Sequence, residues 1–397
     1  MESPKVSVII PFFNSEAYVD EVLESVRGQS LRDVEIICVD DGSTDITLRA
    51  LNENAGKDPR IKVLSQEHKG AGTARNKGLT EARGKYVMFL DSDDSYKNNF
   101  VEEMYNAAEK HGVDIALCWF CQVDSWGSKT IHKLGFDSGR LKPNHPVHPS
   151  EIHNLFITVA PYPHNKIWRR DWVVSQGLFF SDTQAYNDTF FCYASVAAAR
   201  KIVAIDKELY TYRYHHNDSS ISSNRDKYTL DFLKVDKGLY NWLKEKGMLK
   251  MHTKSYCNLW RRHMHGAAGN SREWNIVPPV VKTLIEEEPW SYMTDKELQR
   301  EAGLQTDVAR LRLRVLGKKI QKNGKDISNA NKIVIQNSNR EIEVVQEIIS
   351  QLRTEGRNVR YKAGKLHTGI WMLREKGVHG FLPAAYRMVY RRFSKGV

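Results

Sequence analysis

Several signatures of familiar protein classes are missing from this chain of 397 residues. Its five cysteines are too few and too scattered for the disulfide framework of a small secreted domain. No apolar run approaches the roughly 20 residues that cross a bilayer, and the apolar run near the start is too short for a signal peptide. The composition therefore favours a cytosolic protein, and the length favours two or three domains.

The glycines that a nucleotide-dependent oxidoreductase needs are also missing. The turn after the first predicted strand reads PFFN and contains no glycine, which excludes the G-x-G-x-x-G fingerprint. A sugar nucleotidyltransferase would place a glycine-rich loop at the same turn, so it is the less favoured alternative. Cys118 and Cys121 form a C-x-x-C, but positions three apart on a predicted strand face opposite sides. A metal or redox role for this pair is therefore disfavoured.

Charge is spread unevenly along the chain, whose formal net charge is +11. Residues 1–225 hold 26 basic and 30 acidic side chains, a balance of −4, whereas residues 226–397 hold 33 and 18, a balance of +15. We therefore predict a first domain over residues 1–225 and a basic region over residues 226–397. Such a region suits an anionic partner, either lipid headgroups or nucleic acid, although a merely solvated surface is the alternative. No known nucleic-acid reader motif appears.

The first 120 residues alternate between short β-rich runs and helical patterns. Apolar residues share one helix face over residues 15–28 (Val19, Val22, Leu23 and Val26) and over residues 98–111 (Phe100, Met104, Ala107 and Ala108). This alternation predicts an α/β fold, with a mostly parallel sheet covered by helices on both faces. Such folds bind ligands beyond the carboxyl ends of their strands, where the polar motifs PFFN, DDGSTD and DSDD stand.

The later segments give weaker signals. Residues 122–165 are irregular and predict a long functional loop with one short helix at 149–159. The histidines of this segment lack accompanying acids or cysteines, so lining an acceptor site is favoured over binding zinc. They are His145, His148, His153 and His164. From about residue 226 the pattern becomes mainly helical.

The strongest chemical signal is the motif Asp91-Ser92-Asp93-Asp94 after the buried run YVMFL. Three acids in four residues repel one another unless a cation compensates. Mg²⁺ commonly bridges carboxylates to the phosphates of a substrate. The motif therefore predicts a site for a metal and a diphosphate, with a helix N-cap as an interpretation of equal weight.

Two further motifs suit a nucleotide. Asp40 and Asp41 end the second predicted strand, and an N-cap would explain Ser43 or Thr44 but not two adjacent carboxylates. Those carboxylates could accept hydrogen bonds from a base or a ribose. In the motif GAGTARNKG the glycines allow close approach to a ligand, and Arg75 offers a planar fork for a diphosphate or a base edge.

Taken in order, these motifs resemble the family 2 glycosyltransferases of the GT-A fold. The likeness begins with Pro11 and Asn14 and passes through VDDGSTD, A-R-N and D-S-D. It continues through NKIWRR at 165–170, NDTFF at 187–191, LYTYR at 209–213 and SIS at 220–222. It covers about residues 4–224, and the combined order is far more specific than any single motif. The resemblance implies a GT-A domain followed by a mainly helical accessory region.

The resemblance also implies a role for each matching position. Residues that would bind the nucleotide-sugar, expected to be a UDP-sugar, are Pro11, Asn14, Asp40, Asp41, Arg75, Asp91, Ser92, Arg213, His216, Ser220 and Ser222. Asp93 would hold Mn²⁺ or Mg²⁺, and Asp188 would be the general base. The family usually has Glu before this base, whereas this chain has Asn187. On spacing alone, Asp188 could instead be the N-cap of a helix.

The implied reaction is an inverting sugar transfer. A carboxylate takes the proton of an acceptor hydroxyl as that hydroxyl attacks the anomeric carbon. A metal ion neutralises the charge that develops on the leaving diphosphate. The expected acceptor is a glycan or a lipid-linked molecule, in the synthesis of cell-surface polysaccharide or glycoconjugate. A catalytically inactive protein of the same fold is disfavoured by the intact D-S-D and Asp188.

The end of the chain suggests a membrane surface. Residues 380–393 mix apolar and basic side chains and contain no acid. On a helix the apolar ones would share one side, namely Leu382, Ala385, Tyr386, Val389 and Phe393. That pattern is typical of an interfacial membrane helix, with a terminal helix docked on its own domain as the alternative. We expect peripheral binding to the anionic inner face of the membrane and no nucleic-acid partner.

Overall fold

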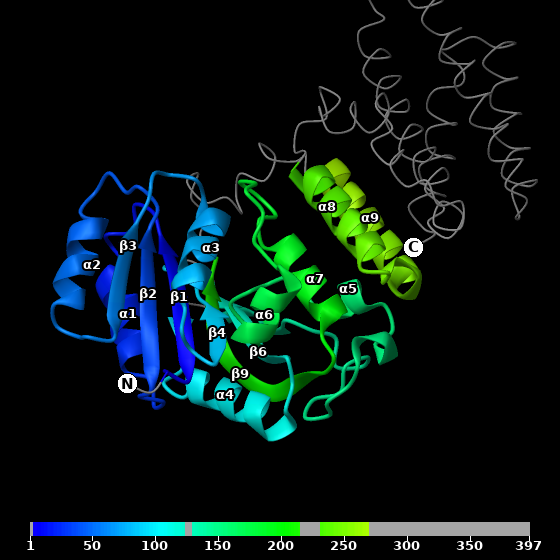
Figure 1. The fold of residues 1–397 in the computed structure, drawn as a ribbon, viewed down its shortest axis with the longest axis horizontal. Helices are drawn as coiled ribbons and strands as arrows, with labels where there is room; N and C mark the ends of the chain where they lie inside the picture. Colours follow the sequence, from blue (N-terminus) through cyan, green and yellow to red (C-terminus); the bar gives the residue numbers. More distant parts are fainter. Residues whose placement is uncertain (1–2, 124–128, 215–230, 270–397) are drawn as a thin grey trace, which may run out of the picture. The chain divides into compact units, whose positions relative to one another are not determined.

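The computed structural model describes residues 3–123, 129–214 and 231–269 (Figure 1). The chain divides into two compact units, Met1–Met264 and His265–Val397. In the first unit the strands are β1 (Val6–Phe12), β2 (Val34–Asp40), β3 (Ile61–Ser65), β4 (Tyr86–Phe89), β5 (Ser95–Tyr96), β6 (Ile115–Val123), β7 (Lys129–Leu134), β8 (Lys166–Arg169) and β9 (Ile202–Arg213).

Helices lie between these strands along the chain and continue after the last strand. They are α1 (Val19–Arg27), α2 (Thr47–Ala55), α3 (Ala71–Glu81), α4 (Phe100–His111), α5 (Leu155–Thr158), α6 (Arg170–Gln176), α7 (Thr189–Ala198), α8 (Asp231–Glu245) and α9 (Leu249–Gly269), with a short 3-10 helix, η1 (Pro149–Glu151). The predicted helical faces are confirmed, because α1 and α4 bury all the apolar residues expected of them. Helix α4 ends at Gly112, whose left-handed φ of 56° suits a helix C-terminus.

Within the described residues the strands form one sheet, in the order β3-β2-β1-β4-β8-β6-β9-β5, with β7 beside β6. Strands β3, β2, β1 and β4 run parallel, and β6 and β9 are also parallel. Strand β8 is antiparallel to both of its neighbours, β4 and β6. The predicted α/β class is confirmed, with the parallel strands carrying the nucleotide-type motifs.

Helices cover both faces of the sheet (Figure 1). Val8 and Ile10 of β1 belong to the core that includes the apolar faces of α1 and α4. Ile9 points the other way, towards α3, where a Cβ atom on Gly78 would lie 2.4 Å from Ile9 Cγ2. All seven residues of β1 are buried as a result. Polar chemistry on these strands is therefore left to their carboxyl ends.

The segment predicted to be a long loop with one short helix has more structure than that. It contains β7, which pairs with β6, as well as η1 and the single turn of α5. All five cysteines are buried free thiols. Burial raises the pKa of Cys118 and Cys192 to about 12. Among the described residues, no helix is both long enough and apolar enough to span a bilayer.

Helix α8 packs against α7, and the first compact unit continues to Met264 in α9. The domain division predicted between residues 225 and 226 falls in residues 215–230, outside the described residues, and stays a prediction. The C-terminal segment 380–393 also lies outside them. The packing of α8 nevertheless shows that part of the predicted basic region is built into the same unit as the sheet.

Candidate active site

The turns after β1, β2 and β4 meet at the carboxyl edge of the parallel strands. The backbone N–H of Asn14 donates to Ser43 Oγ at 3.0 Å, and Asn14 Oδ1 accepts from the backbone N–H of Thr44 at 2.8 Å. Ser15 Oγ lies 3.2 Å from Ser92 Oγ, which joins the first turn to the D-S-D motif. Pro11 is buried at the end of β1, in register with Val39. The structure thus brings together the three motifs that the sequence placed at one edge.

Asp41 organises the loop that leads into α3. It is buried, and its two carboxylate oxygens accept hydrogen bonds from the backbone N–H groups of Lys69 at 2.9 Å and Gly70 at 2.8 Å and from Gln66 Nε2 at 2.7 Å. Nδ1 of His68 lies 2.9 Å from Asp41 Oδ2. The carboxylate therefore fixes this loop, a structural role that adds to the predicted contact with a nucleobase.

Asp40 has a different environment from its neighbour. Its Oδ2 accepts a long hydrogen bond of 3.4 Å from Ser65 Oγ. Its Oδ1 is buried and has no hydrogen-bond partner in the described part of the chain. A buried acceptor without a partner is costly, which makes this oxygen a candidate contact for a ligand donor.

Arg75 connects the motifs predicted to bind the nucleotide-sugar to the segment that ends at Asp188, the predicted base. Its buried guanidinium donates from Nη2 to Asp91 Oδ1 at 2.5 Å and from Nη1 to Asn187 Oδ1 at 3.0 Å, and it lies 5.4 Å from the centre of the Phe180 ring. Burial acts to raise the pKa of Asp91, but the charge of Arg75 and the hydrogen bond from His164 outweigh it and hold that pKa well below its usual range. Asn187, where the family has Glu, thus contacts Arg75.

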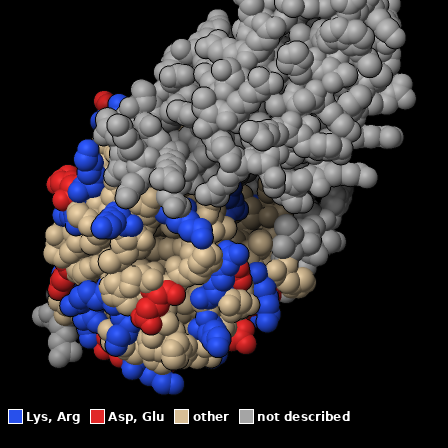
Figure 2. All heavy atoms as spheres, turned by 90° about the vertical axis from the view of Figure 1, so that its right-hand side faces the viewer, with Lys and Arg blue, Asp and Glu red and all other residues tan. Residues whose placement is uncertain are grey.

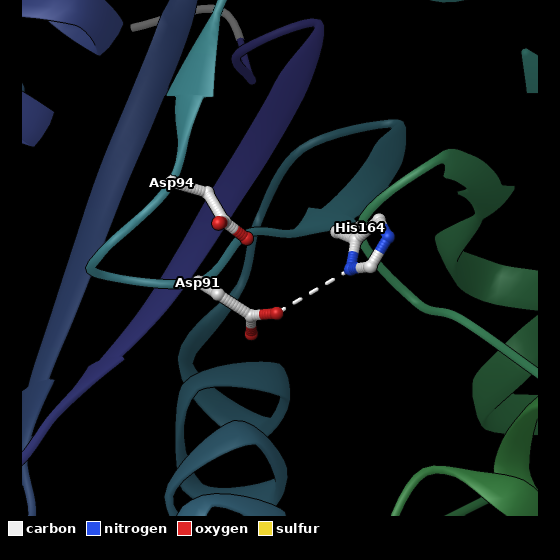
Figure 3. A group of neighbouring side chains, drawn as sticks. All are labelled: Asp91, Asp94 and His164. Carbon is white, nitrogen blue, oxygen red and sulfur yellow. Dashed lines mark hydrogen bonds and ion pairs between the residues drawn. The ribbon is translucent and has the colours of Figure 1, made fainter. Parts of the chain in front are cut away.

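The compact acidic cluster of the site contains Asp91, Asp94 and His164, each offering a ligand atom within 4.8 Å of the others (Figure 3). Asp93, which the resemblance assigned to the metal, is not part of this group, and its role stays a prediction. Burial and the charges of Asp93 and Asp91 raise the pKa of Asp94 well above its usual range. Two carboxylates and an imidazole are donors that a divalent cation accepts, and a cation would relieve this repulsion, so the residues fit a metal ion.

Both oxygens of Asp94 already have partners on β9. Oδ1 accepts from the backbone N–H of Arg213 at 2.7 Å, and Oδ2 accepts from the Tyr210 hydroxyl. Asp94 therefore fixes the end of β9. Three further residues that the resemblance assigned to the nucleotide-sugar, His216, Ser220 and Ser222, come after Arg213 in the sequence and lie outside the described residues.

His164 is the histidine of the irregular segment that lies in the site. Its Nδ1 is 3.4 Å from Asp91 Oδ2, and its ring stacks on Tyr210 with centroids 4.2 Å apart. Burial lowers the pKa of His164, which favours the neutral form. His145, His148 and His153 are exposed. The sequence could not single out His164, because Asp91 lies far from it along the chain.

The NKIWRR motif explains how His164 is held. Lys166 Nζ donates to the carbonyls of Ala160 at 2.8 Å and Tyr162 at 2.6 Å and to Asn165 Oδ1 at 2.8 Å. Asn165 Nδ2 donates to the carbonyl of Cys118 at 2.7 Å. Burial lowers the pKa of Lys166 to about 8. The first two residues of this motif therefore brace the turn that carries the imidazole.

Asp188, the predicted base, stands at the N-cap position of α7 but makes no capping hydrogen bond with its side chain. Its half-buried carboxylate acts to raise the pKa values of both His164 and Lys166, which shows that it lies near them. The simple interpretation as a helix cap therefore does not account for this residue. Its electrostatic effect on His164 of the acidic cluster is consistent with the predicted base, a role that stays a prediction.

Two contacts at the rim escaped the sequence analysis. Phe13 is 43% exposed and stacks on His68, with ring centroids 3.9 Å apart. An exposed aromatic ring beside Asp41 offers a flat face to a base, and the only sequence signal was its place after the first strand. At the end of β9, Arg213 Nη1 pairs with Glu21 of α1 at 3.0 Å.

Comparisons with known proteins agree with this geometry. A sequence model described as "Glycosyl transferase family 2" matches residues 7–172. The putative glycosyltransferase EpsH of Bacillus subtilis is 34% identical over 221 residues, which are 54% of this chain and 62% of EpsH. The matched part thus spans less than two thirds of that relative. Glycosyltransferase GlyG of Streptococcus pneumoniae serotype 4 is 37% identical over 233 residues, 53% of this chain and 71% of GlyG.

A further relative and a solved structure extend the comparison. The cholesterol galactosyltransferase of Borreliella burgdorferi is 31% identical over 258 residues, 60% of this chain and 69% of that protein. S. aureus TarS 1-349 in complex with UDP-GlcNAc superposes with a TM-score of 0.56 at 19% identity, covering 98% of this chain and 92% of that one. Fold and site together define a GT-A glycosyltransferase. The chain belongs to glycosyltransferase family 2.

Proposed function

We propose that this protein transfers a sugar from a UDP-sugar to a hydroxyl of a glycan or lipid-linked acceptor, with inversion at the anomeric carbon. The observation that carries the proposal is the bridge that Arg75 makes between Asp91 and Asn187, because it joins the acidic donor motif to the residue before Asp188. TarS, which shares the fold, was solved with UDP-GlcNAc. The name of the Borreliella relative gives cholesterol as its acceptor, which supports a lipid acceptor here.

On this proposal the nucleotide lies along the carboxyl edge of β1, β2 and β4. Phe13 offers a ring for stacking, Asp40 an acceptor for a base or ribose donor, and Asp91 a contact for the ribose. A divalent Mn²⁺ or Mg²⁺ would supply positive charge against the diphosphate, with Asp93 as its predicted ligand and the cluster of Asp91, Asp94 and His164 as the group that fits a cation. Arg213 at the end of β9 would cover the diphosphate together with His216, Ser220 and Ser222, which the resemblance assigns to a closing loop and which lie outside the described residues.

Asp188 carries the proton transfer. Its carboxylate accepts the proton of the acceptor hydroxyl while the hydroxyl oxygen bonds to the anomeric carbon. The bond from that carbon to the nucleoside diphosphate breaks at the same time, and the electron pair leaves with the diphosphate. Attack opposite the leaving group inverts the configuration. The low pKa of Asp91 keeps that carboxylate ionised beside Arg75.

The test compares Asp188→Asn with the wild type. The variant should bind UDP normally, because the nucleotide contacts lie on other loops, but should release no UDP from a panel of UDP-sugars with Mn²⁺. Wild-type turnover by the variant would remove Asp188 as the base.

In the same assay, a chelator should abolish turnover and Mn²⁺ should restore it, whereas Asp93→Ala should raise the Mn²⁺ concentration required. Turnover that persists in excess chelator would contradict the metal role.

We further propose that the protein works at the inner face of the membrane, where lipid-linked acceptors are found. The basic balance of residues 226–397 supports this location. The rival proposal, a sugar nucleotidyltransferase, has less support, because the chain belongs to a glycosyltransferase family and has no glycine in its first turn.

A further inference from the structure

The segment that leads to Asp188 is held in an unusual backbone conformation. Tyr186 has a φ of +59°, a left-handed value that disfavours a residue with a bulky side chain. Such a conformation costs on the order of 1 kcal/mol or more and persists only where the surroundings enforce it. The turn is closed by the N–H of Thr189 donating to the carbonyl of Tyr186 at 3.1 Å and by the N–H of Ser181 donating to the carbonyl of Asn187 at 2.8 Å.

The surroundings that enforce this turn come from α8 and α9. The backbone N–H of Ala185 donates to Oδ2 of Asp231, the first residue of α8, at 2.9 Å. The ring of Tyr186 lies edge-on to Phe232 of α8, with centroids 6.2 Å apart, and to His263 of α9, with centroids 5.2 Å apart. Both helices follow residue 225, where the sequence alone placed the end of the catalytic domain.

His263 is itself firmly placed. Its Nδ1 lies 3.0 Å from each carboxylate oxygen of Asp236 on α8, and both side chains are buried. The Tyr256 hydroxyl donates to the Asp236 carbonyl at 2.9 Å, which joins the two helices again. A buried carboxylate and imidazole are expensive to desolvate unless they are paired, so this pair fixes the imidazole in one place. That imidazole is one of the two rings against which the Tyr186 ring packs.

We propose that α8 and α9 form a positioning device for the general base, with Tyr186 as the residue through which it acts. Asp231 fixes the backbone at Ala185, His263 and Phe232 fix the ring of Tyr186, and the carboxylate two residues further on is thereby aimed at the acceptor. The inference rests on the proposed role of Asp188. It assigns to the start of the basic region a part in sugar transfer that is independent of any membrane or lipid.

The experiment distinguishes the effect of losing the contacts of the Tyr186 ring from the effect of backbone strain at this position. Tyr186→Asn removes the ring but keeps a residue that tolerates positive φ, whereas Tyr186→Phe keeps the ring. UDP release is measured with the UDP-sugar that the wild type uses best, in the full-length protein with Mn²⁺. Because a displacement of about 1 Å can cost about 100-fold in rate, Tyr186→Asn should lower kcat by roughly 10- to 100-fold. The KM for the donor should change much less than kcat does, because this segment reaches the donor contacts only through the hydrogen bond between Asn187 and Arg75.

Further variants make the test robust. Asp231→Ala removes one hydrogen bond from a half-buried helix start and should lower kcat in the same direction but less, by about 3- to 10-fold, which keeps the test valid even if Tyr186→Asn folds poorly. The control is Lys244→Ala, which changes an exposed residue in the last turn of α8 and should leave kcat unchanged. Tyr186→Phe should stay within about threefold of the wild type, because the ring contacts remain.

The outcomes distinguish this inference from the proposed function. A kcat within twofold of the wild type for both Tyr186→Asn and Asp231→Ala would overturn the positioning role, as would an equal rise in donor KM. If Asp188→Asn, assayed alongside, also keeps full turnover, the base assignment itself fails. An inactive Asp188→Asn beside fully active Tyr186→Asn and Asp231→Ala would refute only the role of α8 and α9.

Discussion

Asp94 shows how one buried carboxylate can serve a site without touching the substrate. Its two oxygens accept hydrogen bonds from the Tyr210 hydroxyl and the Arg213 N–H, so it joins the D-S-D loop to the end of β9. Arg213 begins the segment proposed to cover the diphosphate. At the same time Asp94 shares the acidic cluster with Asp91 and His164, which leaves two possible roles, an anchor or a metal ligand.

A pair of substitutions at Asp94 tells these roles apart. Asp94→Asn keeps an acceptor for the Arg213 N–H and a polar group for Tyr210, so the free energy of unfolding should change by less than about 1 kcal/mol. Asp94→Ala leaves both buried donors unpaired and should cost about 2–4 kcal/mol in urea unfolding, with a raised donor KM. If both variants instead raise the Mn²⁺ requirement equally, Asp94 is a metal ligand.

Asp58 gives a pH-dependent prediction at a site remote from catalysis. Hydrogen bonds from Arg60 lower the pKa of Asp58 to about 2 despite its burial, and Arg27 adds a contact at 3.3 Å. Because the folded pKa lies below the unfolded value of about 3.9, the stabilisation is present above that value and is lost as the pH falls towards 2. Allowing for the partly exposed arginines, Asp58→Asn should cost about 1–2 kcal/mol at pH 7.

The measurement for Asp58 is thermal unfolding of the wild type and Asp58→Asn between pH 7 and the lowest pH at which both fold. The difference in Tm should be constant down to about pH 5 and shrink below it. A difference that does not depend on pH would show that the variant acts through packing rather than through charge. Asp171→Asn is the control, because this carboxylate is 81% exposed and its pair with Arg170 should contribute little.

The sequence identified the motif residues but could not show where their side chains point. The order of motifs predicted that Asp41, Arg75 and Asp91 would meet, and the structure brings them to one edge of the sheet. It could not show that Asp94 rather than Asp93 joins the compact cluster, because spacing in a turn does not fix where a side chain points. It also missed His164, whose importance depends on a pairing with Asp91 in the turn after β4, far away along the chain.

At the scale of elements, helix α3 approaches residues 178–188, the segment that ends at Asp188, so closely that only glycine fits at position 72. A Cβ atom on Gly72 would lie 2.2 Å from the carbonyl oxygen of Ser181 and 3.0 Å from Asn187 Cβ. Asn76, one turn further along α3, exchanges two hydrogen bonds with the backbone of Phe180, at 2.8 and 2.9 Å. The helix that presents Arg75 is thus also a wall for residues 178–188.

Gly72→Ala should therefore damage both stability and turnover. The added methyl group forces α3 and the Ser181 carbonyl apart, at a cost of about 1–3 kcal/mol in the free energy of unfolding. Because Asn187 moves with this segment, kcat should fall more than the donor KM changes. Gly56→Ala at the end of α2 is the matched control, since its Cβ would meet only ordinary contacts and its φ is −65°. Equal effects of the two changes in denaturant unfolding would contradict the argument.

The elements themselves were predictable where periodicity was strong. The apolar faces of α1 and α4 and the buried runs of β1, β2 and β4 follow directly from the sequence. Strands β5 and β8 were not identified, because each is short and depends on antiparallel pairing with a strand from elsewhere in the chain. A window of about ten residues does not include the partner strand, so the local pattern cannot predict the pairing.

At the scale of the whole molecule, the clearest difference between residues 1–225 and residues 226–397 is their net charge. The face in Figure 2 carries basic and acidic side chains intermingled among the described residues. The positive excess lies in residues 226–397, whose balance is +15. Composition revealed this asymmetry at once, but it could not show that α8 packs onto α7 and reaches the segment of the base.

The basic excess leads to a prediction about membranes. Each Lys or Arg near an anionic surface contributes about 1 kcal/mol of attraction, so a region with a balance of +15 should bring the protein to vesicles that contain phosphatidylserine or phosphatidylglycerol. Binding should weaken between about 0.1 and 0.5 M salt, because the Debye length falls. Deleting residues 380–397, whose basic and apolar side chains are proposed to enter the interface, should release the protein in a co-sedimentation assay. Neutral phosphatidylcholine vesicles are the control. Unchanged sedimentation of the shortened chain with anionic vesicles would place the membrane contact elsewhere, whereas equal binding to neutral vesicles would contradict an electrostatic cause.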